Sequence, residues 1–205
     1  IVAGSACSDK KLSEFACENE IGGLEFLSCI PGTVGGGLRM NAGCFDREFK
    51  DILISVQAID RLGQVITIPI KEIISKYRDN NLSKDLIFLS ASLKGEKKNK
   101  KTIKEKMQEF KKIKDKAQPT RMKTSGSTFK NPIKQTNKKV WELIRESVSI
   151  DKKFGDACIS DKHANFFINK NNASFNDMKK LIDFVEKSVE KKTGIKLEKE
   201  IKILE

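Results

Sequence analysis

Several features of membrane and metal-binding proteins are missing from this sequence of 205 residues. No apolar run approaches the roughly 20 residues that a membrane-spanning helix needs, and the first 20 residues lack the basic start and apolar stretch of a signal peptide. The five cysteines form no C-x-x-C pair, and His163 is the one histidine. These absences predict no metal site and no membrane partner, and the odd cysteine count favours a reducing, cytoplasmic location.

The chain also has few aromatic residues near its many basic ones. Its formal net charge is +12, and lysines concentrate at 94–116 and 179–202, interleaved with Glu and Asp at helical spacing. Tyr77 and Trp141 are the only residues of their types, and both lie outside these runs. Such a pattern is typical of solvated helix faces, and an anionic nucleotide substrate explains the charge as well. We therefore expect no nucleic-acid partner, and a basic nucleotide-binding or nucleic-acid-binding module stays an alternative.

Helical and strand-like patterns alternate along the chain, which predicts an α+β fold. Helices are expected at 11–20, 71–77, 101–116, 140–146 and 174–193, and strands at 52–59, 64–68, 86–93 and 195–204. The last helix is expected to begin at a capping box of Ser174 with Asp177. A lysine-rich segment near residue 97 separates a β-rich half from a helix-rich half, which predicts two domains, 1–97 and 98–205.

Glycine is abundant in one stretch. Seven of the 13 glycines fall between Gly22 and Gly43, a density that we take to exclude an ordinary helix or strand interior. We expect a loop whose backbone approaches another group closely. Its N–H groups can cradle a phosphate, but no G-x-G-x-x-G element joins a strand to a helix, and no Walker lysine follows. From the residues alone, a phosphate or cofactor loop and a set of structural tight turns are equally good interpretations.

Two polar segments and the histidine are weaker candidates for a site. Ser125-Gly126-Ser127-Thr128, followed by Lys130 and Asn131, can donate hydrogen bonds to an oxyanion or a sugar, although such clusters are more often turns. Tyr77-Arg78-Asp79-Asn80 reads first as a solvent-facing turn. No Cys or Ser is spaced to pair with His163, which favours a structural histidine.

These segments together resemble the UDP-N-acetylenolpyruvoylglucosamine reductase family. Its flavin-contacting segment is similar to Gly23-Leu24-Glu25-Phe26-Leu27, Ile30-Pro31-Gly32-Thr33-Val34-Gly35-Gly36 and Met40-Asn41-Ala42-Gly43. Later family signatures follow in the right order: Tyr77-Arg78, Gln118-Pro119, Gly126-Ser127-Thr128-Phe129-Lys130-Asn131-Pro132, Trp141-Glu142-Leu143-Ile144, His163-Ala164-Asn165-Phe166 and Leu197-Glu198-Lys199-Glu200-Ile201. The similarity runs along nearly the whole chain, and its order makes it specific.

The resemblance implies a fold and a reaction. The C-terminal part of a vanillyl-alcohol-oxidase-like FAD-binding domain is expected before a smaller α+β substrate-binding domain. The implied cofactors are FAD and NADPH, and the implied partner is a UDP-sugar substrate. In the family reaction NADPH reduces FAD, and a hydride then passes to the enolpyruvyl methylene carbon, which yields UDP-N-acetylmuramate for peptidoglycan. We expect a monomer.

The resemblance also implies roles for single residues. Arg78 is expected to bind the substrate carboxylate and stabilise the enolate through its planar fork of donors. Ser127 is expected to give a proton to the carbanion, and Glu200 to assist, with Glu198 as the rival acid. Substrate contacts are expected from Tyr77 and Asn131. Cofactor contacts are expected from Gly32, Thr33, Val34, Gly35, Gly36, Asn41, Ala42 and Gly43.

The chain departs from the family pattern in three places. Family members carry a further part of the FAD domain, with a Gly-Ser-Asn loop, before the equivalent of Ile1, which predicts that part of the FAD site is missing here. Cys44-Phe45-Asp46 stands where the family has a small residue, an aromatic residue and glycine, and Leu204 stands where it has glycine. Three interpretations follow: an active reductase completed by an upstream segment, an inactive fragment of that enzyme, and the basic binding module.

Overall fold

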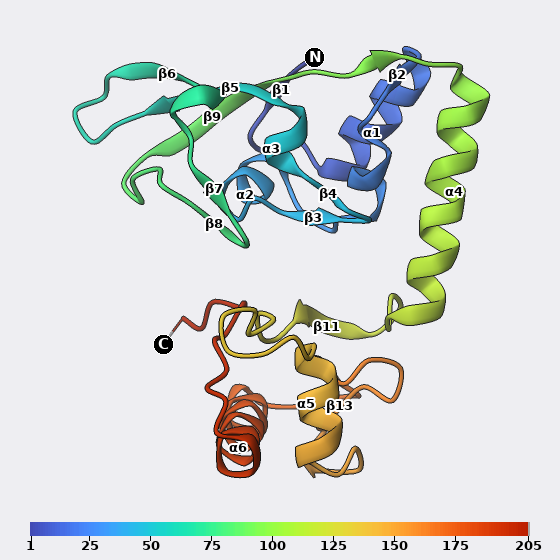
Figure 1. The fold of residues 1–205 in the computed structure, drawn as a ribbon, viewed down its shortest axis with the longest axis vertical. Helices are drawn as coiled ribbons and strands as arrows, with labels where there is room; N and C mark the ends of the chain where they lie inside the picture. The colour runs from blue at the N-terminus through green and yellow to red at the C-terminus, as the bar shows by residue number, and fades with distance from the viewer. Residues whose placement is uncertain (205) are drawn as a thin grey trace. The chain divides into compact units, whose positions relative to one another are not determined.

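The computed structural model describes residues 1–204 and divides into two compact units, Ile1–Ile113 and the residues from Lys114 onward (Figure 1). The sequence predicts a domain boundary at residue 97, whereas the units part within the helix α4 (Lys100–Ala117). The start of α4 belongs to the first unit because Ile103 is buried there and Phe110 packs against its core. The extents of the two functional domains stay a prediction.

The first unit is built around a four-stranded antiparallel sheet with the strand order β1-β9-β5-β6. Its strands are β1 (Val2–Gly4), β5 (Leu53–Ile59), β6 (Val65–Pro69) and β9 (Ile87–Leu93). β5 and β6 form a hairpin in which Ile59 lies opposite Val65. Gly63 in its turn has a φ of 80°, which glycine adopts at little cost. The three longer strands predicted from the sequence are confirmed.

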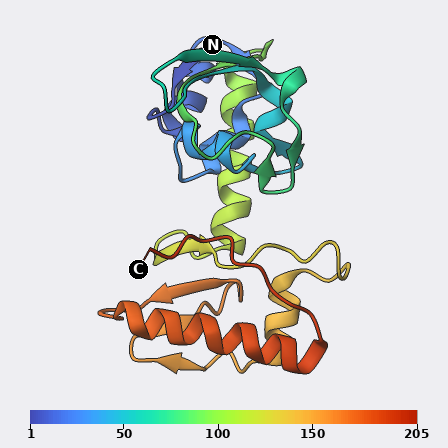
Figure 2. The same ribbon diagram turned by 90° about the vertical axis from the view of Figure 1, so that its left-hand side faces the viewer.

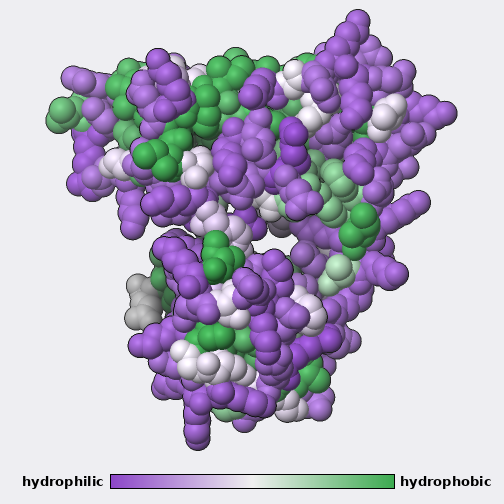
Figure 3. All heavy atoms as spheres, viewed as in Figure 1, coloured by the Kyte–Doolittle hydropathy of each residue, from purple (hydrophilic) through white to green (hydrophobic). Residues whose placement is uncertain are grey.

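Within residues 1–204, one face of this sheet is buried and the other is exposed. Phe88 and Leu93 of β9 are buried, whereas Ile87 and Leu89 are exposed, as the alternation of side chains along a strand requires. The buried face packs against the helices α1 (Asp9–Glu18), α2 (Val34–Arg39) and α3 (Phe49–Ile52). Figure 3 shows green apolar patches among the purple polar side chains on the surface of this unit.

The glycine-rich stretch is not a plain loop. It contains the 3-10 helix η1 (Glu25–Cys29) and α2, so the expectation that its glycines exclude a helix is wrong. α2 is a short helix, and the Thr33 hydroxyl caps it by accepting the Gly36 N–H at 3.4 Å. Gly37 is required within it because a Cβ there would come within 2.1 Å of the buried Phe49 ring. Close packing therefore outweighs the low helix propensity of glycine.

The helix predicted at 71–77 is also wrong. The 3-10 helix η2 (Ile70–Glu72) is followed by a hairpin of β7 (Ser75–Lys76) with β8 (Asp79–Asn80). Tertiary hydrogen bonds override the local helical pattern, since the Asn80 side-chain amide donates to the carbonyls of Leu38 at 2.8 Å and Arg39 at 3.1 Å. Two more short ladders pair β2 (Ile21–Gly22) with β10 (Glu96–Lys97), and β3 (Gly43–Cys44) with β4 (Arg47–Glu48).

The second unit is a four-stranded antiparallel sheet with the strand order β11-β14-β13-β12 and two helices. Its elements are β11 (Lys123–Ser127), α5 (Val140–Ser147), β12 (Lys153–Phe154), β13 (Ala157–Ile159), β14 (Phe166–Asn169) and α6 (Phe175–Thr193). Figure 2 shows α6 running along this sheet. Leu181, Val185 and Val189 of α6 are buried in the core that α6 shares with α5.

The ends of α6 match the sequence prediction, but the strand predicted after it does not form. Ser174 and Asp177 form the capping box, and Gly194 ends the helix with a φ of 73°. The predicted strand at 195–204 is wrong, because this segment makes a single bridge, from Lys199 to Phe129. The segment it meets is a loop, so no ladder continues.

Candidate functional site

The N–H groups at the start of α2 are already bonded within the protein. The Val34 N–H donates to the Cys7 carbonyl and the Gly35 N–H to the Ser5 carbonyl, both at 2.9 Å. The next two N–H groups bond to Thr33. Because these four N–H groups already have acceptors within the protein, the start of α2 does not fit a phosphate cradle. Gly35 serves instead for close approach, since a Cβ there would lie 3.0 Å from Ser5.

The exposed side of this segment still fits a flat ring. Pro31, Gly32, Thr33 and Gly36 are all exposed, and two of them carry no side chain. A Cβ at Gly36 would meet nothing nearer than the Thr33 hydroxyl, at 3.6 Å. An aromatic ring system can approach such a backbone surface closely. The arrangement fits the ring of a flavin better than its phosphates.

Asn41 ties the glycine-rich stretch to the segments around it. Its side chain is buried, and its Nδ2 donates to Glu48 Oε2 at 2.9 Å and to the Lys76 carbonyl at 3.2 Å. Its Oδ1 accepts the Lys50 N–H at 3.0 Å. Its φ of 40° is the left-handed conformation that Asn tolerates better than most residues. The side chain thus holds the loop in shape, and a cofactor contact by Asn41 stays a prediction.

Arg78 occupies the tip of the β7–β8 hairpin, next to Gly43. Its guanidinium donates to the Gly43 carbonyl at 3.3 Å and lies 5.0 Å from the centre of the Tyr77 ring. Its φ is 55°, a conformation that costs a non-glycine residue about 1–2 kcal/mol. Strain of this kind is concentrated at functional sites. The structure therefore brings Arg78 and Tyr77 to the predicted cofactor segment Asn41–Gly43, although their roles stay predictions.

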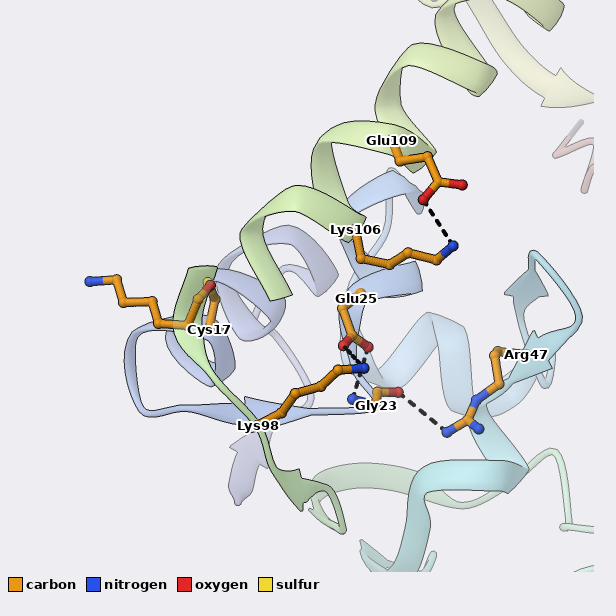
Figure 4. Close-up of polar contacts among 8 residues, drawn as sticks. Cys17, Gly23, Glu25, Arg47, Lys98, Lys106 and Glu109 are labelled. Atoms are coloured by element: carbon orange, nitrogen blue, oxygen red, sulfur yellow. Dashed lines mark hydrogen bonds and ion pairs between the residues drawn. The ribbon is translucent and has the colours of Figure 1, made fainter. Parts of the chain in front are cut away.

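A cavity of about 390 Å³ lies between α4 and the segment that contains η1. Glu25 is buried beside it and accepts the Gly23 N–H at 2.8 Å, and Lys98 Nζ lies 3.7 Å from its other oxygen (Figure 4). Arg47 donates to the Gly23 carbonyl at 3.5 Å. Side chains of both signs line the cavity, together with Phe26 and Phe110. Its lining includes none of the predicted cofactor contacts.

A buried carboxyl lies beside the glycine-rich stretch. Asp9 is fully buried, its N–H donates to the Gly32 carbonyl at 3.1 Å, and within residues 1–204 neither side-chain oxygen has a hydrogen-bond partner. Burial raises the pKa of Asp9 from 3.8 to about 7. Sequence reasoning missed this group, because an Asp in the first turn of a helix is common and its burial comes from the fold.

In the second unit, a β-bulge determines where Ser127 points. The register between β11 and β14 shifts between Thr124 and Ser127, and Gly126 has a φ of 87°. A bulge with glycine in a left-handed conformation re-aims the following side chain. Ser127 is half-buried, whereas Thr128 is buried and Ser125 is exposed. Among these three hydroxyls, the partly exposed one at the bulge is the one predicted to donate a proton.

The C-terminal segment brings Glu200 close to Ser127. The Glu200 N–H donates to the Thr128 carbonyl at 2.8 Å, and the Lys130 N–H donates to the Glu198 carbonyl at 2.8 Å. The exposed Glu198 carboxylate pairs with Lys130 Nζ at 2.6 Å. The choice between Glu198 and Glu200 as the assisting acid stays a prediction.

Asn131 has a structural bond that the sequence did not predict. Its Oδ1 accepts the Val140 N–H at 3.0 Å, at the first turn of α5. His163 is half-buried, and its Nδ1 accepts the Asn165 N–H at 3.3 Å. Burial lowers the pKa of His163, so the neutral imidazole that this hydrogen bond requires is favoured. The substrate contact of Asn131 stays a prediction.

The predicted catalytic residues divide between the units, with Arg78 in the first and Ser127 and Glu200 in the second. No three His, Cys, Asp or Glu side chains among residues 1–204 are grouped to hold a metal ion. In the same range, no helix is both long enough and apolar enough to cross a membrane.

Known protein families match both parts of the chain. The model of the FAD binding domain matches residues 1–69, and the model of the UDP-N-acetylenolpyruvoylglucosamine reductase C-terminal domain matches residues 118–204. The chain is 71% identical over 204 residues to the UDP-N-acetylenolpyruvoylglucosamine reductase of Pelagibacter ubique (strain HTCC1062). This match covers 100% of this chain and 68% of that protein. It is 43% identical over 202 residues to the reductase of the same name from Rickettsia conorii (strain ATCC VR-613 / Malish 7), and this match covers 98% of this chain and 68% of that protein.

A solved structure agrees with these matches. The crystal structure of UDP-N-acetylenolpyruvylglucosamine reductase from Thermus caldophilus superposes with a TM-score of 0.85 at 31% sequence identity, covering 98% of this chain and 71% of that one. The expected α+β fold, with FAD-binding sequence followed by a C-terminal domain, is confirmed. The chain therefore belongs to the UDP-N-acetylenolpyruvoylglucosamine reductase family of FAD-dependent oxidoreductases.

Proposed function

We propose that this chain reduces UDP-N-acetylenolpyruvoylglucosamine to UDP-N-acetylmuramate with NADPH, through FAD, in peptidoglycan precursor synthesis. The observation that carries the proposal is the placement of Ser127 on a bulge, half-buried, with Glu200 bonded to the next residue. Family membership supports the reductase reaction and the FAD cofactor. NADPH as the reductant, the UDP-sugar as the substrate and the cytoplasm as the location are parts of the proposal.

A bound FAD would supply the redox chemistry by which a hydride passes from NADPH to the methylene carbon of the enolpyruvyl group. The exposed backbone of Gly32 and Gly36 provides a surface against which its ring can lie. Because the N–H groups of α2 are bonded within the protein, the phosphates need donors from elsewhere.

Arg78 provides the positive charge that the substrate requires. Reduction at the methylene carbon leaves a carbanion beside the substrate carboxylate, and both charges need fixed donors. The guanidinium can hold a carboxylate through two parallel hydrogen bonds. The hydrogen bond from the Arg78 guanidinium to the Gly43 carbonyl ties the hairpin tip to the segment Asn41–Gly43.

Ser127 provides the proton. Its O–H bond breaks as the carbon next to the carboxylate gains hydrogen, and the serine oxygen recovers a proton from water. Serine is a weak acid, so this step depends on a fixed neighbourhood that stabilises the developing negative oxygen. Glu200, whose N–H donates to the Thr128 carbonyl, is the residue that we propose to assist through its carboxyl.

The test begins with the flavin. Purified protein is mixed with FAD and desalted, and a retained, perturbed visible flavin band is expected. NADPH should bleach that band, and the enolpyruvyl UDP-sugar should restore it without oxygen. A flavin that NADPH bleaches but the UDP-sugar does not restore would contradict the proposed substrate. Failure to retain FAD would favour the inactive-fragment interpretation.

A further inference from the structure

A clamp of hydrogen bonds fixes the two residues that follow Ser127. The side chain of Asn165 bonds twice to the backbone of Phe129, because its Oδ1 accepts the Phe129 N–H at 2.9 Å and its Nδ2 donates to the Phe129 carbonyl at 2.8 Å. The Asn165 carbonyl accepts the Thr128 N–H at 2.8 Å. One buried side chain, with its own backbone, therefore holds both residues.

The clamp is itself held on two sides. The Asn165 N–H donates to His163 Nδ1 at 3.3 Å, and the Phe129 ring lies edge-on to the Phe167 ring, with centroids 6.0 Å apart. Asn165 is buried, so its bonds form where competition from water is weak. Its side chain therefore has one favoured position.

The same clamp also reaches Glu200. The Thr128 N–H bonds to Asn165, and the Thr128 carbonyl bonds to the Glu200 N–H at 2.8 Å. The backbone of Thr128, next to Ser127, is thus held between Asn165 and the segment that carries Glu200. Small displacements of a reacting group are costly: a shift of about 1 Å can slow a reaction roughly a hundredfold.

We propose that Asn165 is a positioning residue that holds the Ser127 hydroxyl in its reactive place by clamping Thr128 and Phe129. This inference rests on the proposed function of Ser127 as the proton donor. Asn165 itself touches neither substrate nor cofactor in this account. It acts through the backbone, so its loss should slow proton transfer without affecting reduction of the flavin.

The variant Asn165→Asp tests this role, because lowering the pH should restore the hydrogen bonds that the ionised Asp loses. A protonated Asp can accept the Phe129 N–H and donate its O–H to the Phe129 carbonyl, as Asn does. An ionised Asp loses the donor and turns a charged oxygen toward that carbonyl. Burial raises the pKa of such a carboxyl, so the clamp should recover as the pH falls.

A matched control lies in the same unit. Asn169 makes the same kind of clamp on Ala173, accepting its N–H at 2.9 Å and donating to its carbonyl at 3.3 Å. Asn169 lies opposite Lys123, at the other end of β11 from Ser127. Asn169→Asp therefore repeats the same chemical change at a half-buried position, away from the proposed proton donor.

The two half-reactions are measured by stopped flow on FAD-loaded protein between pH 5.5 and 8, each variant relative to wild type at the same pH. For Asn165→Asp at pH 8 we expect flavin reoxidation by the enolpyruvyl UDP-sugar to be slower by roughly ten- to a hundredfold. The ratio should approach one at pH 5.5. Flavin reduction by NADPH should be unchanged, and Asn169→Asp should change neither step. Equal effects of the two variants, or no pH-dependent rescue, would overturn the proposal.

Hydrogen exchange separates this inference from the proposed function. If the wild-type flavin is not reoxidised by the UDP-sugar, the proposed function fails and the clamp is judged by exchange alone. In Asn165→Asp, the Thr128 and Phe129 amides should exchange faster at pH 8 than in wild type, after correction for intrinsic rates, and normally at pH 5.5. Unchanged exchange at pH 8 would overturn the clamp.

Discussion

Replacing Asp9 by Asn should remove a pH dependence from the stability of the first unit. Asp9 is fully buried, without a hydrogen-bond partner for either side-chain oxygen in the described part of the chain, and its pKa rises from 3.8 to about 7 on folding. The folded state therefore holds this proton more tightly than the unfolded state. The contribution of the proton to stability is full below about pH 4 and is lost as the pH rises to about 7.

The size of the effect follows from the same values. A rise from 3.8 to about 7 is about three pKa units, and each unit corresponds to 1.36 kcal/mol. The free energy of unfolding should therefore fall by about 4 kcal/mol between pH 4 and pH 8. Asn does not titrate, but its buried amide would lack partners and would cost about 1–3 kcal/mol at every pH. The slope with pH, and not the absolute difference, is the diagnostic quantity.

Urea unfolding followed by far-UV circular dichroism measures this slope. The unfolding free energy of Asp9→Asn minus that of wild type should increase from pH 5 to about pH 7 and level off by pH 8. Glu14→Gln on the same helix is the matched control, because Glu14 is exposed and pairs only loosely with Lys10, at 3.7 Å. That control should stay within about 0.5 kcal/mol of wild type at every pH. A difference between Asp9→Asn and wild type that does not change with pH would refute the reasoning.

Three further predictions concern single positions. Gly37→Ala should lower the free energy of unfolding by about 1–3 kcal/mol, because its Cβ would lie 2.1 Å from the Phe49 ring. Gly36→Ala should leave the free energy of unfolding unchanged or slightly higher, because its Cβ would make only an ordinary contact with the Thr33 hydroxyl, at 3.6 Å. Urea titrations that rank the two variants equally would contradict this. Gly126→Ala should cost about 1 kcal/mol at a φ of 87° and slow the step that needs Ser127, measured by flavin reoxidation. Since burial lowers the pKa of His163, the folded state resists protonation there, so stability should fall as the pH drops below about 6.5; His163→Gln should abolish this loss in thermal unfolding.

Much of the fold follows from local sequence patterns. The longer strands of the first unit and the capping box and glycine stop of α6 were all predictable, because side-chain alternation and capping residues act over a few neighbours. The errors occur where distant contacts decide. The glycines of α2 are fixed by Phe49 and Ser5, and the 71–77 segment is drawn into a hairpin by Asn80. Neither contact has a local signal.

The candidate site was only partly predictable for the same reason. The resemblance named Arg78, Ser127 and Glu200. The burial of Asp9 and the two hydrogen bonds between the Asn165 side chain and the Phe129 backbone appear only in three dimensions. A signal for Asn165 existed in the motif His163-Ala164-Asn165-Phe166. That motif gave no role, because a buried Asn is recognised by the partners that satisfy it.

The central claim is that Ser127 gives the proton in the second half-reaction, and stopped flow of Ser127→Ala tests it most directly. The FAD-loaded variant is mixed first with NADPH and then, without oxygen, with the enolpyruvyl UDP-sugar, beside Ser125→Ala as an exposed neighbouring control. We predict that flavin reduction stays at the wild-type rate while flavin reoxidation slows by at least about a hundredfold, and that Ser125→Ala behaves as wild type in both steps. Equal losses in both half-reactions, or a wild-type rate of reoxidation in Ser127→Ala, would contradict the account.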